Sequence, residues 1–252
     1  VEFLSMDKRT RLTVCAVPQA YECNPHVHAG YRPLGQTWGW YAASALSWHN
    51  ETINSATMFV GLVLFLDSLE HADSFEKVIF CSAVSLMFAC STAYHIFWPH
   101  SVETWRLLMR LDHTCIVLCV GSYVFPLASL LFGRVAIETY AYWFLASVAT
   151  CTSALLVATG NLCIADRLKL TIATTWFIPA LWAHAYLAGR DVGAFVGALF
   201  VGTLYVKGAT AYAMRIPESV WPGKFDYFGS HEIMHVCVLT ATFLHYKWYF
   251  NN

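Results

Sequence analysis

The sequence predicts an all-α membrane protein, a bundle of seven transmembrane helices with a cytoplasmic N-terminus and an extracellular C-terminus. The composition is 58% hydrophobic and only 12% charged, whereas a soluble domain carries about 25% charged residues. Seven apolar stretches follow one another, and the short connections between them hold the turn and charged residues. The net charge of −1 gives no indication of a nucleic-acid partner.

Residues 1–54 form the polar part of the chain, and residues 55–252 are predicted to form the transmembrane domain. Within the polar part, the aromatic segment 36–48 predicts an interfacial helix on the membrane surface. Most of the later stretches have the roughly 20 apolar residues that cross a bilayer. The predicted spans are 55–69, 77–98, 111–132, 136–158, 168–188, 192–213 and 229–250. We therefore expect a multi-pass protein of the plasma membrane or an internal membrane.

The positive charges near the ends of the spans predict the orientation. Seven lie on the side of the N-terminus and four on the other side. The first group is Arg32, Arg106, Arg110, Arg167, Lys169, Arg215 and Lys224, and the second is Lys77, Arg134, Arg190 and Lys247. This bias places the N-terminus in the cytoplasm, so the glycosylation sequon at Asn50 is expected to remain unmodified.

Ionisable side chains at three span ends are the candidates for chemistry, because such residues are costly inside a membrane. His95 ends the second span, Asp112 opens the third, and His231 and His235 open the seventh. The alternation of spans brings all of them to the cytoplasmic level of the bundle. His231 and His235 share a helix face, because they are four residues apart. His95 is the predicted third ligand of a metal ion.

Three histidines with one open position are typical of catalytic zinc, and imidazole suits this metal. Asp112 is predicted to accept a proton from the metal's water or to hold that water. Ser91, one helical turn before His95, is expected to orient the water or the developing oxyanion. The His231-Glu232-x-x-His235 pattern also occurs in zinc proteases, where the Glu is the base. A helix N-terminal acid is the alternative role for Glu232.

The chain resembles the progestin and adiponectin Q receptors, a group that includes adiponectin receptors and bacterial haemolysin-III-like proteins, in several sequence motifs. They are Gly30-Tyr31-Arg32-Pro33, His49-Asn50-Glu51-Thr52, Ser91-x-x-x-His95, Leu111-Asp112, Ile216-Pro217-Glu218, Pro222-Gly223-Lys224-Phe225-Asp226 and Ser230-His231-x-x-x-His235. The resemblance implies seven helices, a cytoplasmic N-terminus and zinc on His95, His231 and His235, with Asp112 near the bound water. Adiponectin receptors commonly carry Gln in place of Glu232, so the family's chemistry does not require an acid there.

The resemblance also implies hydrolysis of a lipid amide of the ceramide type, or signalling that depends on it. The expected partners are membrane lipids, with a ceramide-like substrate and a free fatty acid product, and an extracellular protein or lipid ligand. The alternative is a hormone or lipid receptor without turnover, in which zinc is structural. An intramembrane protease is a third hypothesis, based on the histidine–glutamate pattern alone.

Overall fold

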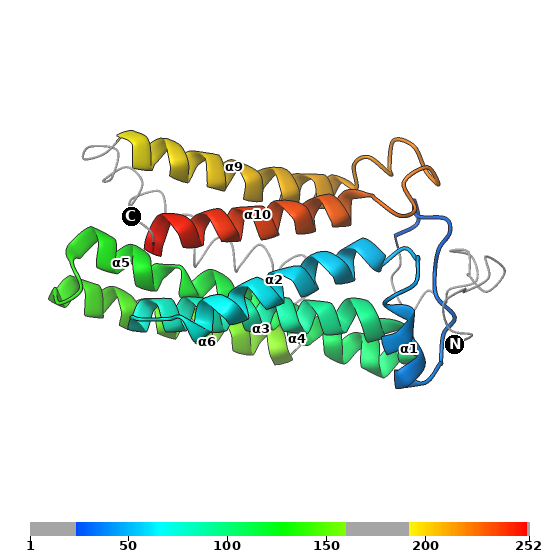
Figure 1. The fold of residues 1–252 in the computed structure, drawn as a ribbon, viewed down its shortest axis with the longest axis horizontal. Helices are drawn as coiled ribbons and strands as arrows, with labels where there is room; N and C mark the ends of the chain where they lie inside the picture. Colours follow the sequence, from blue (N-terminus) through cyan, green and yellow to red (C-terminus); the bar gives the residue numbers. More distant parts are fainter. Residues whose placement is uncertain (1–23, 160–191, 251–252) are drawn as a thin grey trace. The chain divides into compact units, whose positions relative to one another are not determined.

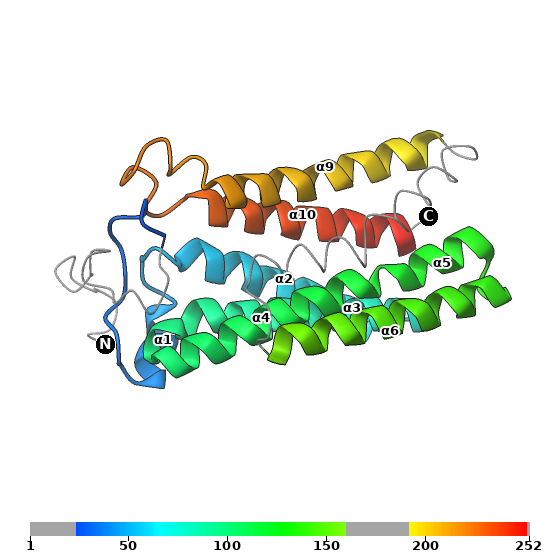
Figure 2. The same ribbon diagram turned by 180° about the vertical axis from the view of Figure 1, so that it is seen from behind.

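The computed structural model describes residues 24–159 and 192–250, and the secondary-structure elements of these residues are helices (Figures 1 and 2). In chain order, they are α1 (Trp38–Ser44), α2 (Thr52–Glu70), α3 (Phe75–Phe97), the 3₁₀ turn η5 (Trp98–His100), α4 (Val102–Ser122), α5 (Val124–Phe132), α6 (Ile137–Thr159), α9 (Val192–Met214) and α10 (Ser230–Phe250). The short helix α1 occurs inside the segment 36–48, and its place on a membrane surface stays a prediction.

Four helical segments within the described ranges are long and apolar enough to cross a membrane. They are Thr52–Glu70, Phe75–His100, Val102–Leu130 and Ile137–Thr159. Large apolar side chains on these helices are exposed, such as Phe59 on α2 and Phe144 and Leu145 on α6. Exposed apolar surface on this scale is suited to lipid rather than water. The prediction of a helical membrane protein is therefore confirmed for the described residues, while the predicted span 168–188 lies outside them.

The third predicted span begins later than the helix that contains it. The sequence analysis placed it at 111–132, but α4 begins at Val102. Glu103, Arg106 and Arg110 lower the hydropathy of this first part, yet these side chains are exposed and interrupt no backbone hydrogen bond. Asp112 consequently lies ten residues into α4, about 15 Å along its axis, rather than at its start.

A break at Tyr123 separates α4 from α5. Pro126 lies in the first turn of α5, where its missing N–H is tolerated. In a continuous helix, however, the proline ring would collide with the carbonyl group four residues earlier, which belongs to Ser122. The chain therefore ends one helix at Ser122 and begins the next at Val124.

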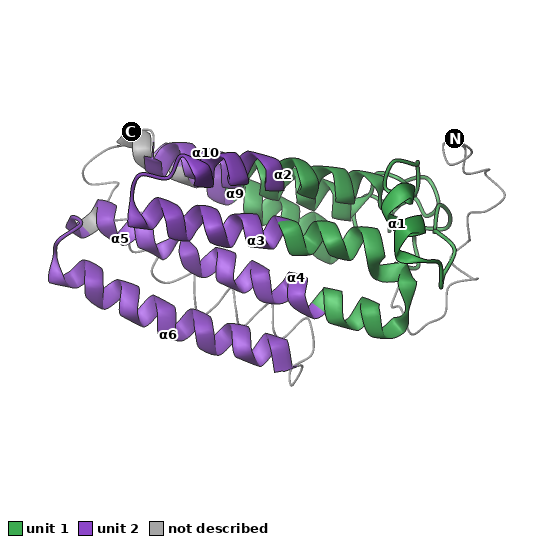
Figure 3. Ribbon diagram, turned by 60° about the horizontal axis from the view of Figure 1, so that its bottom comes forward, with its two compact units in different colours: residues 1–60, 89–109, 203–241 green, residues 61–88, 110–202, 242–252 purple. Residues whose placement is uncertain are grey.

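Two compact units divide the chain (Figure 3). Unit 1 comprises residues 1–60, 89–109 and 203–241, and unit 2 comprises residues 61–88, 110–202 and 242–252. Five of the helices contribute a part to each unit. Unit 1 thus holds α1, the first turns of α2, α4 and α10, and the last turns of α3 and α9.

Unit 1 has an aromatic core in which Tyr31, Trp98 and Trp105 are 2–5% exposed. The N-terminal strap, residues 24–34, is attached to the connection between α9 and α10 by three hydrogen bonds. Gly223 N donates to His26 O at 3.0 Å, His28 N to Asp226 Oδ1 at 2.7 Å, and Asn24 Nδ2 to Glu218 Oε1 at 3.0 Å. The strap is therefore an integral part of unit 1.

Unit 2 is held together by aromatic packing and by close helix contacts at glycine. Phe65 lies within 6.2 Å of Phe80 and 5.8 Å of both Phe88 and Tyr246, measured between ring centroids. A Cβ atom on Gly121 of α4 would come within 2.1 Å of Thr150 Oγ1 on α6. Only glycine allows α4 and α6 this approach, which is a common device of membrane helices.

Candidate metal centre

Three histidines converge in unit 1, from two helices. His95 lies in the last turn of α3, and His231 and His235 lie in the first two turns of α10. Their candidate ligand atoms all lie within 4.8 Å of one another. The ring centroids are 5.0 Å apart for His95 and His231, 4.8 Å for His95 and His235, and 4.6 Å for His231 and His235. The structure thus brings together the three residues that the sequence analysis selected.

The burial of these rings fits a metal-binding role. His95 and His235 are 0% and 4% exposed. His95 Nε2 and His235 Nδ1 have no hydrogen-bond partner among the described residues. A buried nitrogen without a partner costs about 1–3 kcal/mol, and a bound metal ion removes this cost. Imidazole donors suit several divalent transition metals, so the geometry supports a metal site without identifying the metal.

Glu51 is a neighbour of this site to which the sequence analysis assigned no role. Its Oε2 atom lies 2.7 Å from His95 Nδ1 and accepts a hydrogen bond of 2.8 Å from Asn54 Nδ2. Burial alone would raise the pKa of the Glu51 carboxyl, but the hydrogen bond to His95 and the nearby positive charge hold that pKa well below its usual range. The signal in the sequence was the His49-Asn50-Glu51-Thr52 motif.

Arg32 is fully buried and fixes the end of the helix that carries His95. Its guanidinium donates to the carbonyl oxygens of His95 and Ile96, the latter at 2.8 Å. These carbonyls belong to the last turn of α3 and have no partner inside the helix. Burial lowers the pKa of Arg32 to about 10, while Glu51 acts in the opposite direction, so the guanidinium remains charged at neutral pH.

Two carboxylates cap the N-terminus of α10. Glu218 accepts hydrogen bonds from Ser230 N, at 2.8 Å, and from Ser230 Oγ. Glu232 Oε2 accepts from Gly229 N at 2.7 Å, which is the reciprocal bond of a capping box. Glu232 therefore has the structural role of a helix N-terminal acid, and α10 presents its two histidines from a fixed first turn.

The two predicted catalytic residues lie in different units. Ser91 is buried in α3, one turn before His95, within unit 1. Asp112 is 9% exposed and belongs to the part of α4 in unit 2. The role of Asp112 beside the histidines stays a prediction.

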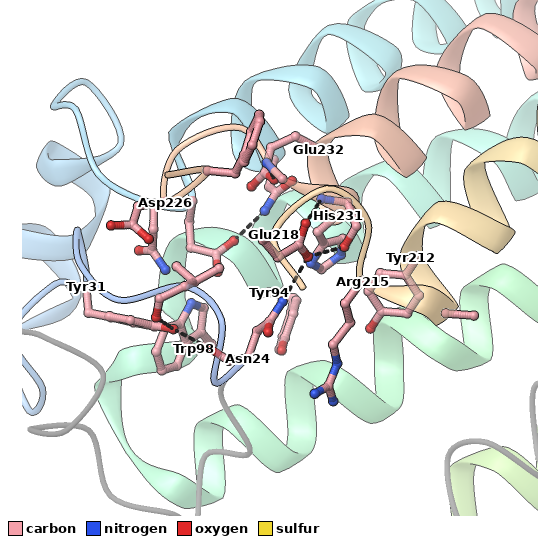
Figure 4. A pocket seen from close by; sticks show the side chains of 18 of the residues that line it. Asn24, Tyr31, Tyr94, Trp98, Tyr212, Arg215, Glu218, Asp226, His231 and Glu232 are labelled. Atoms are coloured by element: carbon pink, nitrogen blue, oxygen red, sulfur yellow. Dashed lines mark hydrogen bonds between the residues drawn. The ribbon is translucent and has the colours of Figure 1, made fainter. Parts of the chain in front are cut away.

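A pocket of about 310 Å³ in unit 1 includes His231 in its lining (Figure 4). Aromatic and polar side chains share its wall. They include Tyr31, Tyr94, Trp98, Trp105, Tyr212, Asn24, Asn50, Glu51, Asn54, Glu218, Asp226, Ser230 and Glu232. In Figure 4, Glu218 and Glu232 lie beside His231, whereas the Arg215 side chain extends away from them.

The sequon residue Asn50 is buried in this unit. It is 7% exposed, and its backbone N–H donates to Gly30 O at 3.0 Å. Gly30 has a φ of +91°, and a Cβ atom there would lie 2.9 Å from Tyr227 Cε1 and 3.2 Å from Asn50 N. Gly30 and Asn50 therefore pack closely in unit 1, and the absence of modification at the sequon stays a prediction.

Comparison with known proteins identifies relatives across most of the chain. The sequence profile of the haemolysin-III-related family matches residues 46–246. The chain is 26% identical to an adiponectin receptor protein of Drosophila melanogaster and 27% identical to progestin and adipoQ receptor-like protein 1 of Caenorhabditis elegans, each over 91% of the chain. It is 27% identical to heptahelical transmembrane protein 1 of Arabidopsis thaliana over 96% of the chain.

The matched regions cover 56% and 58% of the two animal relatives and 81% of the plant one, so the chain spans a little over half the length of the first two. The profile match nevertheless begins before α2, ends within α10 and includes all three histidines. The three histidines thus lie within the region that matches the family, and the chain belongs to the haemolysin-III-related family of multi-pass membrane proteins, together with these adiponectin- and progestin-receptor-like relatives.

Proposed function

We propose that this protein is a zinc-dependent membrane hydrolase that cleaves the amide bond of a ceramide-like lipid and acts in lipid or metabolic signalling. The products are a sphingoid base and a free fatty acid. The observation that carries the proposal is the convergence of His95, His231 and His235 within 4.8 Å. As part of it, we infer a bundle of seven spans with a cytoplasmic N-terminus, as the charge bias and the name of the plant relative suggest.

Each residue has a role in the proposed reaction. Zinc on three histidines would supply a Lewis acid and lower the pKa of a coordinated water toward about 7. We assign Asp112 as the general base that takes a proton from the attacking water and passes it to the leaving amine. The water oxygen bonds to the carbonyl carbon, and the amide C–N bond breaks. Ser91 would orient the water or the developing oxyanion.

The pocket beside His231 supports a lipid substrate with a polar head. Its volume of about 310 Å³ is at the lower end of the range for small-molecule sites. Tyr94 and Trp98 offer aromatic surface, while Asn24 and Ser230 offer hydrogen-bonding groups. Such a mixed lining suits the hydroxyl and amide groups of a lipid head more than a purely apolar chain.

A receptor without turnover is the second candidate, and the names of the animal relatives favour it. In that case a metal ion on the three histidines would join α3 to α10 and have only a structural role. The protease hypothesis loses support, because the Glu232 carboxylate is engaged with Gly229 N in the helix cap.

The substitution Asp112→Asn separates the enzyme from the receptor. Zinc should remain bound, because the three histidines are unchanged. Turnover of a ceramide should fall by about 10²–10⁴-fold, since the amide cannot accept the proton that a general base takes. Zinc content is measured by elemental analysis of the purified protein, and turnover by the release of fatty acid.

Glu232→Gln is the matched control. The Gln side chain can still accept the hydrogen bond from Gly229 N, so turnover should change little. An Asp112→Asn protein that keeps its zinc and hydrolyses ceramide at the parent rate would show that the assigned base is wrong. Loss of activity in Glu232→Gln alone would return the protease chemistry to consideration. A parent that binds ligand without turnover would favour the receptor.

A further inference from the structure

The contact between Glu51 and His95 joins the segment before the first span to the histidine site. His95 Nδ1 lies 2.7 Å from Glu51 Oε2, and the side chains of His95 and Glu51 are 1% and 16% exposed. An ionised carboxylate only accepts hydrogen bonds, so Nδ1 must carry the hydrogen. The lone pair of the imidazole is then on Nε2, the atom that has no hydrogen-bond partner among residues 24–159 and 192–250.

Glu51 is itself held in place. Asn54, 1% exposed in the first turn of α2, donates from Nδ2 to the same oxygen, Glu51 Oε2, at 2.8 Å. The backbone N–H of Glu51 donates to His49 Nδ1 at 3.1 Å. The carboxylate is therefore restricted on both its side-chain and its backbone end, as is expected of a residue that orients another one.

The His95 backbone has a separate support. Arg32 donates to the His95 carbonyl oxygen and to that of Ile96. With this carbonyl fixed, the remaining freedom of His95 is rotation of its side chain, and the Glu51 hydrogen bond restricts that rotation. Arg32 and Glu51 thus act on different parts of the same residue, and both precede the first span.

We propose that Glu51 is the positioning residue of the metal centre: it holds His95 in the tautomer and orientation that direct Nε2 to the metal. This inference rests on the proposed function only in taking zinc as the ion bound by the three histidines. Carboxylates that accept the second hydrogen of a metal-binding histidine occur widely, and their loss typically lowers metal affinity or activity 10–100-fold. Part of the zinc affinity therefore comes from the N-terminal segment, outside the spans.

The test is the zinc affinity of purified full chains, measured by competition with a chelator of known affinity. Glu51→Gln should bind zinc about tenfold more weakly, because the amide keeps an acceptor but loses the charge; Glu51→Ala should lose about 100-fold. Glu76→Gln is the matched control. Glu76 is also a buried acid, 4% exposed, but its partners are Ser129 Oγ at 2.8 Å and Arg134 Nε at 3.4 Å, both in unit 2. Its substitution should leave zinc affinity within twofold of the parent.

Two further measurements separate positioning from a general loss of structure. Cobalt(II) in place of zinc should show altered visible absorption in Glu51→Gln and parent-like absorption in Glu76→Gln, because the bands report ligand geometry. In a His95→Ala background, Glu51→Gln should have no further effect on affinity, since it acts through His95.

Equal zinc affinity in the parent and in Glu51→Gln would overturn this inference alone. So would an undiminished effect of Glu51→Gln in the His95→Ala background. If Glu51→Ala does not fold, Glu51→Gln decides the question by itself. A parent that binds no zinc at all would instead overturn the proposed function, and this inference with it.

Discussion

His95 is held at both its side chain and its backbone. Its ring is bonded to Glu51, its carbonyl to Arg32, and the whole residue is 0% exposed. His231 and His235 lie on one face of α10, about 6 Å apart along its axis. At the scale of the residue, the site therefore joins a pair placed on one face by helical periodicity to a histidine held by Glu51 and Arg32, which are distant in the sequence.

The α10 histidine pair leads to a test of the metal. Purified parent protein should carry about one zinc per chain, since three histidines form a single site. His235→Ala should lose most of this zinc during dialysis against a chelator, because it removes half of the i,i+4 pair. Elemental analysis gives the metal content.

His245→Ala is the appropriate comparison, because it removes a histidine from the same helix. His245 is buried in unit 2, ten residues and about 15 Å along α10 from His235. Its loss should leave the zinc content unchanged. Full zinc occupancy in both His231→Ala and His235→Ala would exclude the site.

At the scale of the element, the helix ends matter more than the helix interiors. The last turn of α3 receives the Arg32 guanidinium, and the first turn of α10 receives Glu218 and Glu232. A positive group at a helix C-terminus and negative groups at a helix N-terminus both complement the helix dipole. Two carbonyls in the last turn of α3 and two N–H groups at the start of α10 thus have charged side-chain partners at the site.

Replacement of Arg32 by Ala should destabilise unit 1 by on the order of 3 kcal/mol. The change leaves buried carbonyl groups of α3 without a donor, and hydrogen bonds to a charged group contribute about 1.5–3 kcal/mol each. Thermal unfolding in detergent measures the effect. Arg106→Ala is the control. Arg106 is exposed on α4, so its replacement should change the free energy of unfolding by less than about 0.5 kcal/mol. Equal stability of the two variants would show that Arg32 does not support the helix end.

At the scale of the whole molecule, the number of spans determines which loops share a side of the membrane. Arg134 follows α5 and Lys224 precedes α10, and both are exposed. Between them lie α6, the segment 168–188 and α9. If all three cross the membrane, the two positions lie on opposite sides. If 168–188 does not cross, they lie on the same side.

Single cysteines at these positions test the proposed topology. An impermeant thiol reagent applied to intact cells should label Arg134→Cys but not Lys224→Cys, as the charge bias predicts. Glu103→Cys should remain unlabelled, because it lies on the same proposed cytoplasmic side as Lys224. Asp73→Cys should be labelled, because it lies on the same proposed outer side as Arg134. The unsubstituted chain gives the background from its native thiols. Labelling of both Arg134→Cys and Lys224→Cys would refute the seven-span arrangement, and the reverse pattern would refute the orientation.

The sequence by itself determined the class of the fold and the choice of histidines. Apolar stretches of bilayer length predict membrane helices because a membrane requires each span to satisfy its own backbone. Alternation of spans then places His95 and the α10 pair at one level, and periodicity places His231 and His235 on one face. Local pattern and chain order were enough to select these histidines, and the structure brings the three together in unit 1.

Only the tertiary structure decided what surrounds the histidines. Glu51 and His95 are 44 residues apart, Arg32 and His95 are 63 apart, and Asn24 and Glu218 are 194 apart. The hydropathy pattern also did not predict that α4 begins at Val102. Charged residues in the first turns of a helix can remain exposed while the backbone hydrogen bonds of the helix continue through them. Such contacts form only when the chain folds and brings distant residues together. Periodicity and composition therefore do not predict them.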